Sequence, residues 1–221
     1  MAIVSFWTED DKETGQTSTA IAVATQMAIQ HNKKVLLIST YENNKEIDAA
    51  YIKPQAQKSN LLSFLNLNKK TVGIESGVTG LMKIEGSNKL SPELIKDYTG
   101  IIFKERLEVL SGYDGVETPT IDAFYVSLIK KANMVYDIVL VDLKKGINEL
   151  AQDILTISDV VVYGMTQKRH SIEVYSKSRK DGYTSKNYNI VGYIGRYDKF
   201  SKYTQKNILR TIKTKDSLFP I

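Results

Sequence analysis

The chain has 221 residues, a formal net charge of +5 and a pI of about 9.1, and 42% of its residues are hydrophobic, as in soluble globular proteins. It contains no cysteine, which excludes disulfides, thiolate metal sites and a cysteine nucleophile. It has two histidines, His31 and His170, which argues against a histidine-rich metal centre. No apolar run approaches the roughly 20 residues of a membrane span, and no signal-peptide pattern opens the chain, so we expect a cytoplasmic protein.

Short apolar runs alternate with segments of helical periodicity along most of the chain. The run at 35–38 is continuously apolar, which is typical of a strand covered on both faces in a parallel sheet. Strands are predicted at residues 2–7, 35–38, 107–110, 138–142, 159–163 and 190–194. Helices are predicted at about residues 16–31, 61–67, 75–84, 92–98, 123–135, 147–156, 171–180 and 202–212.

This alternation of strands and helices predicts the fold class. Strands that alternate with helices form a mostly parallel, doubly wound sheet with right-handed crossovers. We therefore expect a three-layer α/β fold with about six or seven strands and with helices on both faces. One domain is expected for residues 1–221, with a variable helical region at about residues 59–100.

Residues 2–30 have the pattern of a strand, a polar loop at 8–15 and a helix. In nucleotide-binding α/β proteins such a loop holds phosphates with backbone N–H groups at the helix N-terminus. The loop pattern G-x-x-x-x-G-K-[ST] retains its second glycine, Gly15, and its hydroxyl residue, Thr17, which would bind Mg²⁺. A plain alternative fits equally well, in which the glycine makes a tight turn and Thr17 or Ser18 caps the helix.

Three positions of this loop carry the wrong chemistry for ordinary phosphate binding. Asp10 stands where the first glycine is expected, and Gln16 stands where a lysine would reach the β- and γ-phosphates. Exchanging an ammonium for an amide at a phosphate loses on the order of 2–3 kcal/mol. Asp10 and Asp11 add carboxylates, each of which repels a phosphate a few ångströms away by about 1–4 kcal/mol. The loop therefore predicts weak or altered nucleotide binding and a loss of ATP hydrolysis.

The order of further motifs resembles the ParA/MinD family of deviant Walker (SIMIBI-class) P-loop ATPases, including its TadZ/CpaE pilus-assembly branch. The family's YDxxxxD motif, a strand that ends in a Mg²⁺-associated aspartate, is intact at residues 136–142. In a further family motif, Ala or Ser and then Asp precede a strand that is followed by Thr, and residues 158–166 match this motif. Its VxGxxxN motif begins at Val191, but Gly195 stands at or near the adenine-reading asparagine and Arg196 follows.

The chain departs from this family at residues that serve catalysis. The family loop reads KGGxGKTT, and its signature lysine reaches into a partner's active site; here Asp11 holds that position and Lys12 is displaced by one. A family strand that ends in aspartate runs here into Ser39 and Thr40. The resemblance implies ATP or ADP at Lys12, Thr14, Gly15, Gln16, Thr17, Ser18 and Arg196, and Mg²⁺ at Thr17 and Asp142. As alternatives, Asp142 is a relic carboxylate at a strand end and Lys12 is a solvated loop charge.

The C-terminal stretch is cationic and amphipathic. Its basic residues include Lys199, Lys202, Lys206, Arg210 and Lys213. Phe200, Tyr203 and Ile208 contribute to an apolar side. In the resembled family such surfaces touch DNA non-specifically or meet an anionic membrane. Two alternatives are an ordinary amphipathic helix packed on the sheet and a docking site for a partner helix.

We therefore expect a ParA/MinD-like scaffold protein with a degenerate ATP site, a bacterial pseudo-ATPase in the cytoplasm or at the membrane periphery. It would position or regulate a partner assembly, such as a pilus, conjugation or plasmid-partition machine, through protein contacts, alone or as a homodimer. One alternative is a Mg-ATP-dependent dimerising switch with an atypical loop, in which Lys12 or a partner's residue replaces the missing charge. Another is a basic DNA-binding accessory protein, whose DNA affinity would depend steeply on salt.

Overall fold

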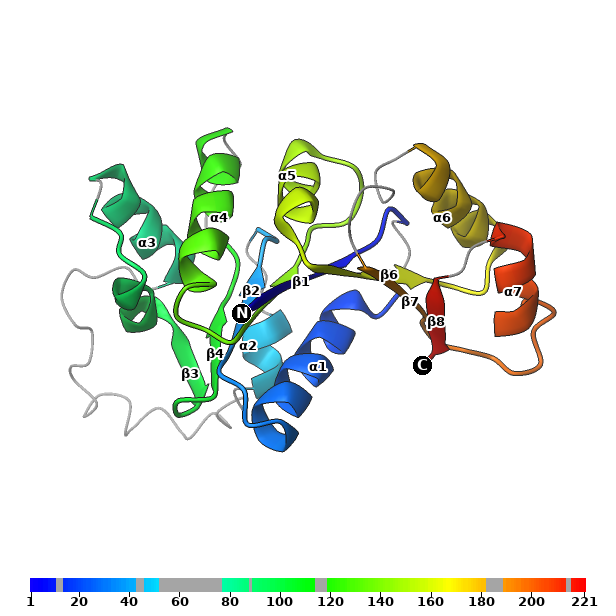
Figure 1. Cartoon of the computed structure of the whole chain (residues 1–221), viewed down its shortest axis with the longest axis horizontal. Helices are drawn as coiled ribbons and strands as arrows, with labels where there is room; N and C mark the ends of the chain where they lie inside the picture. Colours follow the sequence, from blue (N-terminus) through cyan, green and yellow to red (C-terminus); the bar gives the residue numbers. More distant parts are fainter. Residues whose placement is uncertain are drawn as a thin grey trace, which may run out of the picture.

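The computed structural model describes residues 1–10, 14–42, 46–51, 77–87, 89–113, 119–181, 189–213 and 216–221. Within these residues, eight strands form one sheet in the order β3-β4-β2-β5-β1-β6-β7-β8 (Figure 1). Neighbouring strands are parallel except β3 and β4, which are antiparallel. The strands are β1 (Ala2–Trp7), β2 (Val35–Ser39), β3 (Gly100–Phe103), β4 (Leu107–Leu110), β5 (Ile138–Asp142), β6 (Val160–Met165), β7 (Asn189–Ile194) and β8 (Ser217–Pro220).

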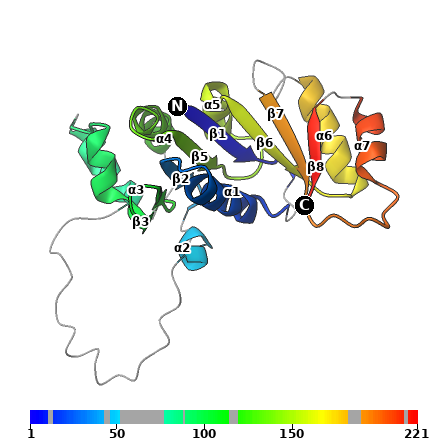
Figure 2. The ribbon, with the colours of Figure 1, turned by 60° about the horizontal axis from the view of Figure 1, so that its bottom comes forward.

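Helices cover both faces of this sheet. Two separate clusters of buried side chains join α1 and α2 to one face and the other described helices to the opposite face. Figure 2 shows α2 on one side of the sheet and α4 and α5 on the other. The helices are α1 (Gln16–Gln30), α2 (Glu46–Tyr51), α3 (Gly77–Gly86), the 3₁₀ helix η1 (Glu93–Tyr98), α4 (Pro119–Ala132), α5 (Glu149–Ile157), α6 (Arg169–Asp181) and α7 (Gln205–Ile212).

Helix α1 lies close to the sheet because its buried face is made of small side chains. Ala20, Ala24 and Ala28 are each 0% exposed and recur at a spacing of four, which places them on one side of the helix. They belong to the same buried cluster as Phe6 of β1 and Leu140 of β5. This packing brings the N-terminus of α1 to the ends of the two central strands.

The carboxyl ends of three central strands meet at one edge of the sheet. Asp142, the last residue of β5, is level with Phe6 of β1 and with Ser39 of β2. In parallel α/β sheets, ligands bind in the crevice outside this edge. The loop from β1 to α1 starts here, so the fold places that loop beside Asp142.

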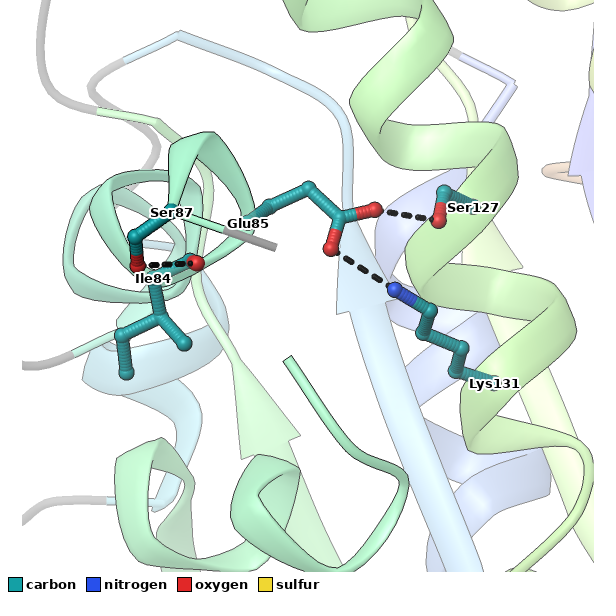
Figure 3. Close-up of polar contacts among 5 residues, drawn as sticks. All are labelled: Ile84, Glu85, Ser87, Ser127 and Lys131. Carbon is teal, nitrogen blue, oxygen red and sulfur yellow. Dashed lines mark hydrogen bonds and ion pairs between the residues drawn. The ribbon is translucent and has the colours of Figure 1, made fainter. Parts of the chain in front are cut away.

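Away from this edge, a carboxylate joins the outer helices α3 and α4 (Figure 3). Glu85 of α3 accepts hydrogen bonds from the Ser127 hydroxyl and from the Lys131 ammonium of α4, each at 2.7 Å. These two bonds hold the pKa of Glu85 below its ordinary value, because both favour the carboxylate. The pair fixes α3 against α4 at the surface.

The predicted fold class is confirmed, and each of the six predicted strands is present with similar bounds. The sequence pattern misses β3 and β8. Both are four-residue strands at the two edges of the sheet, where too few side chains are buried to give an apolar run. Of the residues described, no helix is both long and apolar enough to cross a membrane.

Several predicted helix bounds need correction. The helix predicted at 123–135 begins at Pro119 and ends at Ala132, and proline is a favoured first helical residue. The helix predicted at 202–212 begins later, because the Thr204 hydroxyl accepts a hydrogen bond from the Asn207 N–H and caps the helix there. The segment predicted at 92–98 is a 3₁₀ helix, and the helix predicted at 61–67 lies outside the described residues.

Candidate functional site

The loop between β1 and α1 enters its helix through Gly15. This residue has φ 76° and ψ 25°, in the left-handed region that favours glycine. Its carbonyl accepts hydrogen bonds from the N–H of Thr19 at 2.9 Å and from the Thr19 hydroxyl at 2.8 Å. No described side chain caps this N-terminus. The alternative in which Thr17 or Ser18 caps the helix is therefore wrong, since the helix already begins at Gln16.

Gln16 and Thr17 both point to the end of β5, where they bind Asp142. The Gln16 Nε2 donates to Asp142 Oδ1 at 2.7 Å and to the Leu143 carbonyl at 2.6 Å. The Thr17 hydroxyl donates to Asp142 Oδ2 at 2.7 Å. Each carboxylate oxygen thus has a donor from the first turn of α1. We call Gln16, Thr17 and Asp142 the loop–strand network.

The carboxyl group in this network is fully enclosed. Burial of Asp142, which is 0% exposed, raises its pKa to about 6, because the charged form is poorly solvated. The hydrogen bonds from Gln16 and Thr17 act in the opposite direction, since they favour the carboxylate. The two neutral donors, Gln16 and Thr17, therefore provide most of the stabilisation of the buried Asp142 carboxylate near neutral pH.

The side chains of the network fit a metal ion in part. The Thr17 hydroxyl and the Asp142 carboxylate are oxygen ligands of the kind that Mg²⁺ prefers. Gln16 is 2% exposed, and its Oε1 has no hydrogen-bond partner among the described residues, so it offers a further buried acceptor. For a triphosphate the fit is poorer, because the position of the phosphate-binding lysine presents the neutral amide of Gln16.

A cavity of about 500 Å³ opens at the carboxyl ends of β6 and β7. Gly195, which follows β7, forms part of its lining, and a Cβ there would lie 2.1 Å from the Thr14 carbonyl oxygen. The β1–α1 loop therefore packs directly against Gly195 and borders the cavity. A side chain at this position, such as the asparagine expected from the family motif, requires Thr14 to move. The lining residues are Thr166, Gln167, Lys168, Gly195, Arg196, Asp198 and Ser201.

The structure brings together several predicted site residues and separates others. Gln16, Thr17 and Asp142 meet as described, with Gly15 at the start of their helix. Thr14 is buried beside Gly195, and Arg196 lines the cavity. Ser18 is exposed on the first turn of α1, and Lys12 lies outside the described residues. The predicted basic residues occupy a different surface, the β7–α7 loop and α7. They are Lys199, Lys202, Lys206, Arg210 and Lys213.

Three contributors to the site are absent from the sequence prediction. The Leu143 carbonyl accepts from Gln16, and sequence patterns carry no signal for a backbone acceptor. Thr40, at the end of β2, accepts from the Lys144 N–H at 2.8 Å and so shapes the turn after Asp142. Gln167 donates to the carbonyls of Asp198 at 3.0 Å and Tyr203 at 2.8 Å, which fixes the β7–α7 loop beside the cavity. A polar residue just past a strand end is the signal that could have found the last two.

No family model matches the sequence, and no curated protein matches it. Solved structures do match. A ParA family ATPase from Chlorobium tepidum TLS superposes with a TM-score of 0.74 at 15% identity, over 99% of this chain and 83% of that one. The fold is that of the ParA/MinD ATPases.

Two further neighbours with the ParA/MinD fold show the range of the match. A plasmid partition protein of Borrelia burgdorferi bound to AMPPNP has a TM-score of 0.66 at 19% identity, over 100% of this chain and 84% of that one. MinD in the MinC:MinD cell division complex of Aquifex aeolicus has a TM-score of 0.65 at 15% identity, over 99% and 79%. The neighbours thus include proteins of plasmid partition and of cell division.

Proposed function

We propose that this protein is a pseudo-ATPase with the ParA/MinD fold, a scaffold that positions or regulates a partner assembly through protein contacts. Pilus, conjugation and plasmid-partition machines are assemblies of the expected kind. The observation that carries the proposal is the contact set of Gln16, which stands at the lysine position and bonds to Asp142 and to the Leu143 carbonyl. The side chain that should meet a phosphate is thus engaged within the protein.

The energetic argument has two parts. An amide in place of an ammonium loses a charge-assisted bond to the phosphate, on the order of 2–3 kcal/mol. Binding a triphosphate through Gln16 would also break its bonds to Asp142 and Leu143, and a buried acceptor left unpaired costs about 1–3 kcal/mol. Together these terms disfavour both tight Mg-ATP binding and stabilisation of the charge that develops during phosphoryl transfer.

Partner binding is the activity that such a scaffold retains. MinD of Aquifex aeolicus, a neighbour with this fold, was solved in a complex with MinC. We expect this chain to bind a protein partner in the same general manner, alone or as a homodimer that does not depend on nucleotide. The basis for nucleotide independence is that Asp11 occupies the place of the signature lysine.

A second candidate function is a Mg-ATP-dependent switch with an atypical loop, located in the cytoplasm. Two observations favour it: the retained oxygen ligands of Thr17 and Asp142, and the cavity lined by Arg196 beside the loop. In this case Thr17 and Asp142 would hold Mg²⁺, and the backbone from Thr14 to Ser18 would hold phosphates. Bound Mg²⁺ would supply charge neutralisation at the phosphates.

Calorimetric titration with Mg-ATP distinguishes the two functions. The scaffold predicts no binding, or binding at millimolar ATP that is the same in Thr17→Ala, and no phosphate release above background. The switch predicts micromolar binding that Thr17→Ala and Asp142→Ala both weaken. Thr19→Ala is the matched control, because the Thr19 hydroxyl bonds the Gly15 carbonyl, and among the described residues Gln16 and Thr17, not Thr19, bond the Asp142 carboxylate. Micromolar binding sensitive to Thr17 would refute the pseudo-ATPase.

A further inference from the structure

A cluster of charged side chains lies at the amino edge of the parallel strands, at the other end of the sheet from the loop–strand network. Lys34 directly precedes β2, and Tyr136 and Asp137 directly precede β5, which is paired with β2. Glu108 is the second residue of β4, the other neighbour of β2. The cluster therefore gathers around the start of β2 and shares no residue with the site described above.

Glu108 is the centre of this cluster. It is 7% exposed, and its Oε2 accepts hydrogen bonds from the Tyr136 hydroxyl and, at 2.8 Å, from the Thr99 hydroxyl. The Thr99 hydroxyl also lies 2.9 Å from the carbonyl oxygen of Lys96, a residue of η1. The Lys34 nitrogen lies over the Tyr136 ring, 5.0 Å from its centre. Glu108 thus brings Lys34 and Lys96 to the same place.

The side-chain nitrogens of Lys34 and Lys96 are in hydrogen-bonding contact. An ammonium group donates hydrogen bonds and accepts none, so this contact requires one of the two to be a neutral amine. Partial burial and the adjacent Lys96 charge lower the pKa of Lys34, while the carboxylates of Glu108 and Asp137 act more weakly in the opposite direction. Within the described part of the chain, neither lysine forms an ion pair. The pair is therefore an amine, Lys34, beside an ammonium, Lys96.

We propose that Lys34 is a site of covalent acylation by acyl phosphates, with Lys96 as the residue that positions the donor. The Lys34 amine attacks the acyl carbon, a C–N bond forms, and the bond from that carbon to the phosphate oxygen breaks. The phosphate leaves with the electron pair and takes the proton that the nitrogen releases. The Lys96 ammonium attracts the anionic donor and stabilises the phosphate as it leaves. A neutral amine next to a positive charge suits this class of donor.

Acylation would change the contacts at this edge of the sheet. An amide carries no positive charge, so the modified side chain would lose its electrostatic attraction to the Tyr136 ring and to the carboxylates of Glu108 and Asp137. This inference goes beyond the scaffold function. Neither proposal depends on the other, because the two sets of residues lie at opposite ends of the strands.

The neighbouring residue Lys33, which is exposed, provides an internal control. The full chain would be incubated with acetyl phosphate near neutral pH and cleaved at acidic residues, and mass spectrometry would follow acetylation at each lysine. We expect Lys34 to react about fivefold faster than Lys33, because a like charge a few ångströms away disfavours the protonated form by about that factor. The advantage should shrink as the pH approaches about 10, where an ordinary lysine also loses its proton.

Variants of Lys96 test its positioning role. Lys96→Gln should slow the acetylation of Lys34 about fivefold, to the rate of Lys33, because the neighbouring charge is removed. Lys96→Arg keeps that charge and should keep the reactivity of Lys34. Lys177→Gln is the matched control, since Lys177 is exposed on α6, and it should leave the rate at Lys34 unchanged. Circular dichroism should show that all three variants fold.

Three results would overturn the proposal. Equal rates at Lys33 and Lys34 would show that the Lys34 nitrogen is an ordinary ammonium. An unchanged rate at Lys34 in Lys96→Gln would remove the role of Lys96. A preference for Lys34 with acetic anhydride but not with acetyl phosphate would leave a reactive amine and exclude acyl phosphates as its donors.

Discussion

Gln16 and Asp142 lie 126 positions apart in the chain, and their side chains meet in a 2.7 Å hydrogen bond at the carboxyl edge of the sheet. The same amide group also binds the Leu143 carbonyl at 2.6 Å. The Gln16 side chain thus links the first turn of α1 to the end of β5, and this link does not require a bound phosphate.

Gln16→Ala should destabilise the fold by about 2–3 kcal/mol, because it leaves Asp142 Oδ1 and the Leu143 carbonyl buried without their donor. Urea unfolding followed by circular dichroism measures this change. Gln26→Ala is the matched control on the same helix, where the glutamine is exposed, and it should cost less than about 0.5 kcal/mol. Equal effects of the two variants would mean that the Gln16 hydrogen bonds contribute nothing to stability.

Asp142 should make the fold less stable as the pH rises from about 4 to about 6. Burial raises its folded-state pKa from an ordinary 3.8 to about 6, so between these values the native state holds a proton that the unfolded chain releases. The loss approaches about 3 kcal/mol at neutral pH. Stability against urea across this range measures it, and Asp142→Asn should remove this part of the pH dependence. An unchanged slope in the Asn variant would contradict the raised pKa.

Gln16→Lys should increase Mg-ATP affinity by about 30-fold or more, because it returns an ammonium to the phosphate-binding position. Calorimetry measures the gain. Thr17→Ala in the same background should remove much of it, since the retained hydroxyl is then the metal ligand. No gain in affinity would show that the loop fails to bind phosphate for reasons other than the missing charge.

Gly195→Ala should destabilise the protein by about 1–3 kcal/mol, because the added methyl would lie 2.1 Å from the Thr14 carbonyl and force the loop away from β7. Thermal unfolding measures the cost. Gly86→Ala, where a Cβ meets nothing within 4 Å, is the control and should be neutral or mildly stabilising. If the two substitutions behave alike, Thr14 does not pack on β7 as described.

The fold could be predicted because its strands are buried runs with a clear pattern. All five residues of β2 are buried, and the apolar run at 35–38 predicts this strand. The strand β3 has three exposed residues of its four, so its sequence carries no burial pattern. Edge strands are formed by pairing with a neighbour, and a single sequence does not reveal that partner.

The site could be predicted as a set of residues but not as a network. Motif spacing identifies Gln16, Thr17 and Asp142, since each occupies a fixed place in a loop or at a strand end. The direction of the Gln16 side chain depends on an acceptor 127 positions away, the Leu143 carbonyl. The close approach of Thr14 to Gly195 likewise depends on how two distant segments pack. Such contacts follow from the tertiary fold.

The loop–strand network also has a consequence for the lifetime of an assembly that the protein would organise. ATPases that hydrolyse their nucleotide can use each cycle to set how long an assembly lasts. Under the proposed function, a loop held by Gln16, Thr17 and Asp142 keeps one conformation at any cellular ATP concentration. The lifetime of whatever the protein organises would then follow from the supply and turnover of the protein and its partner.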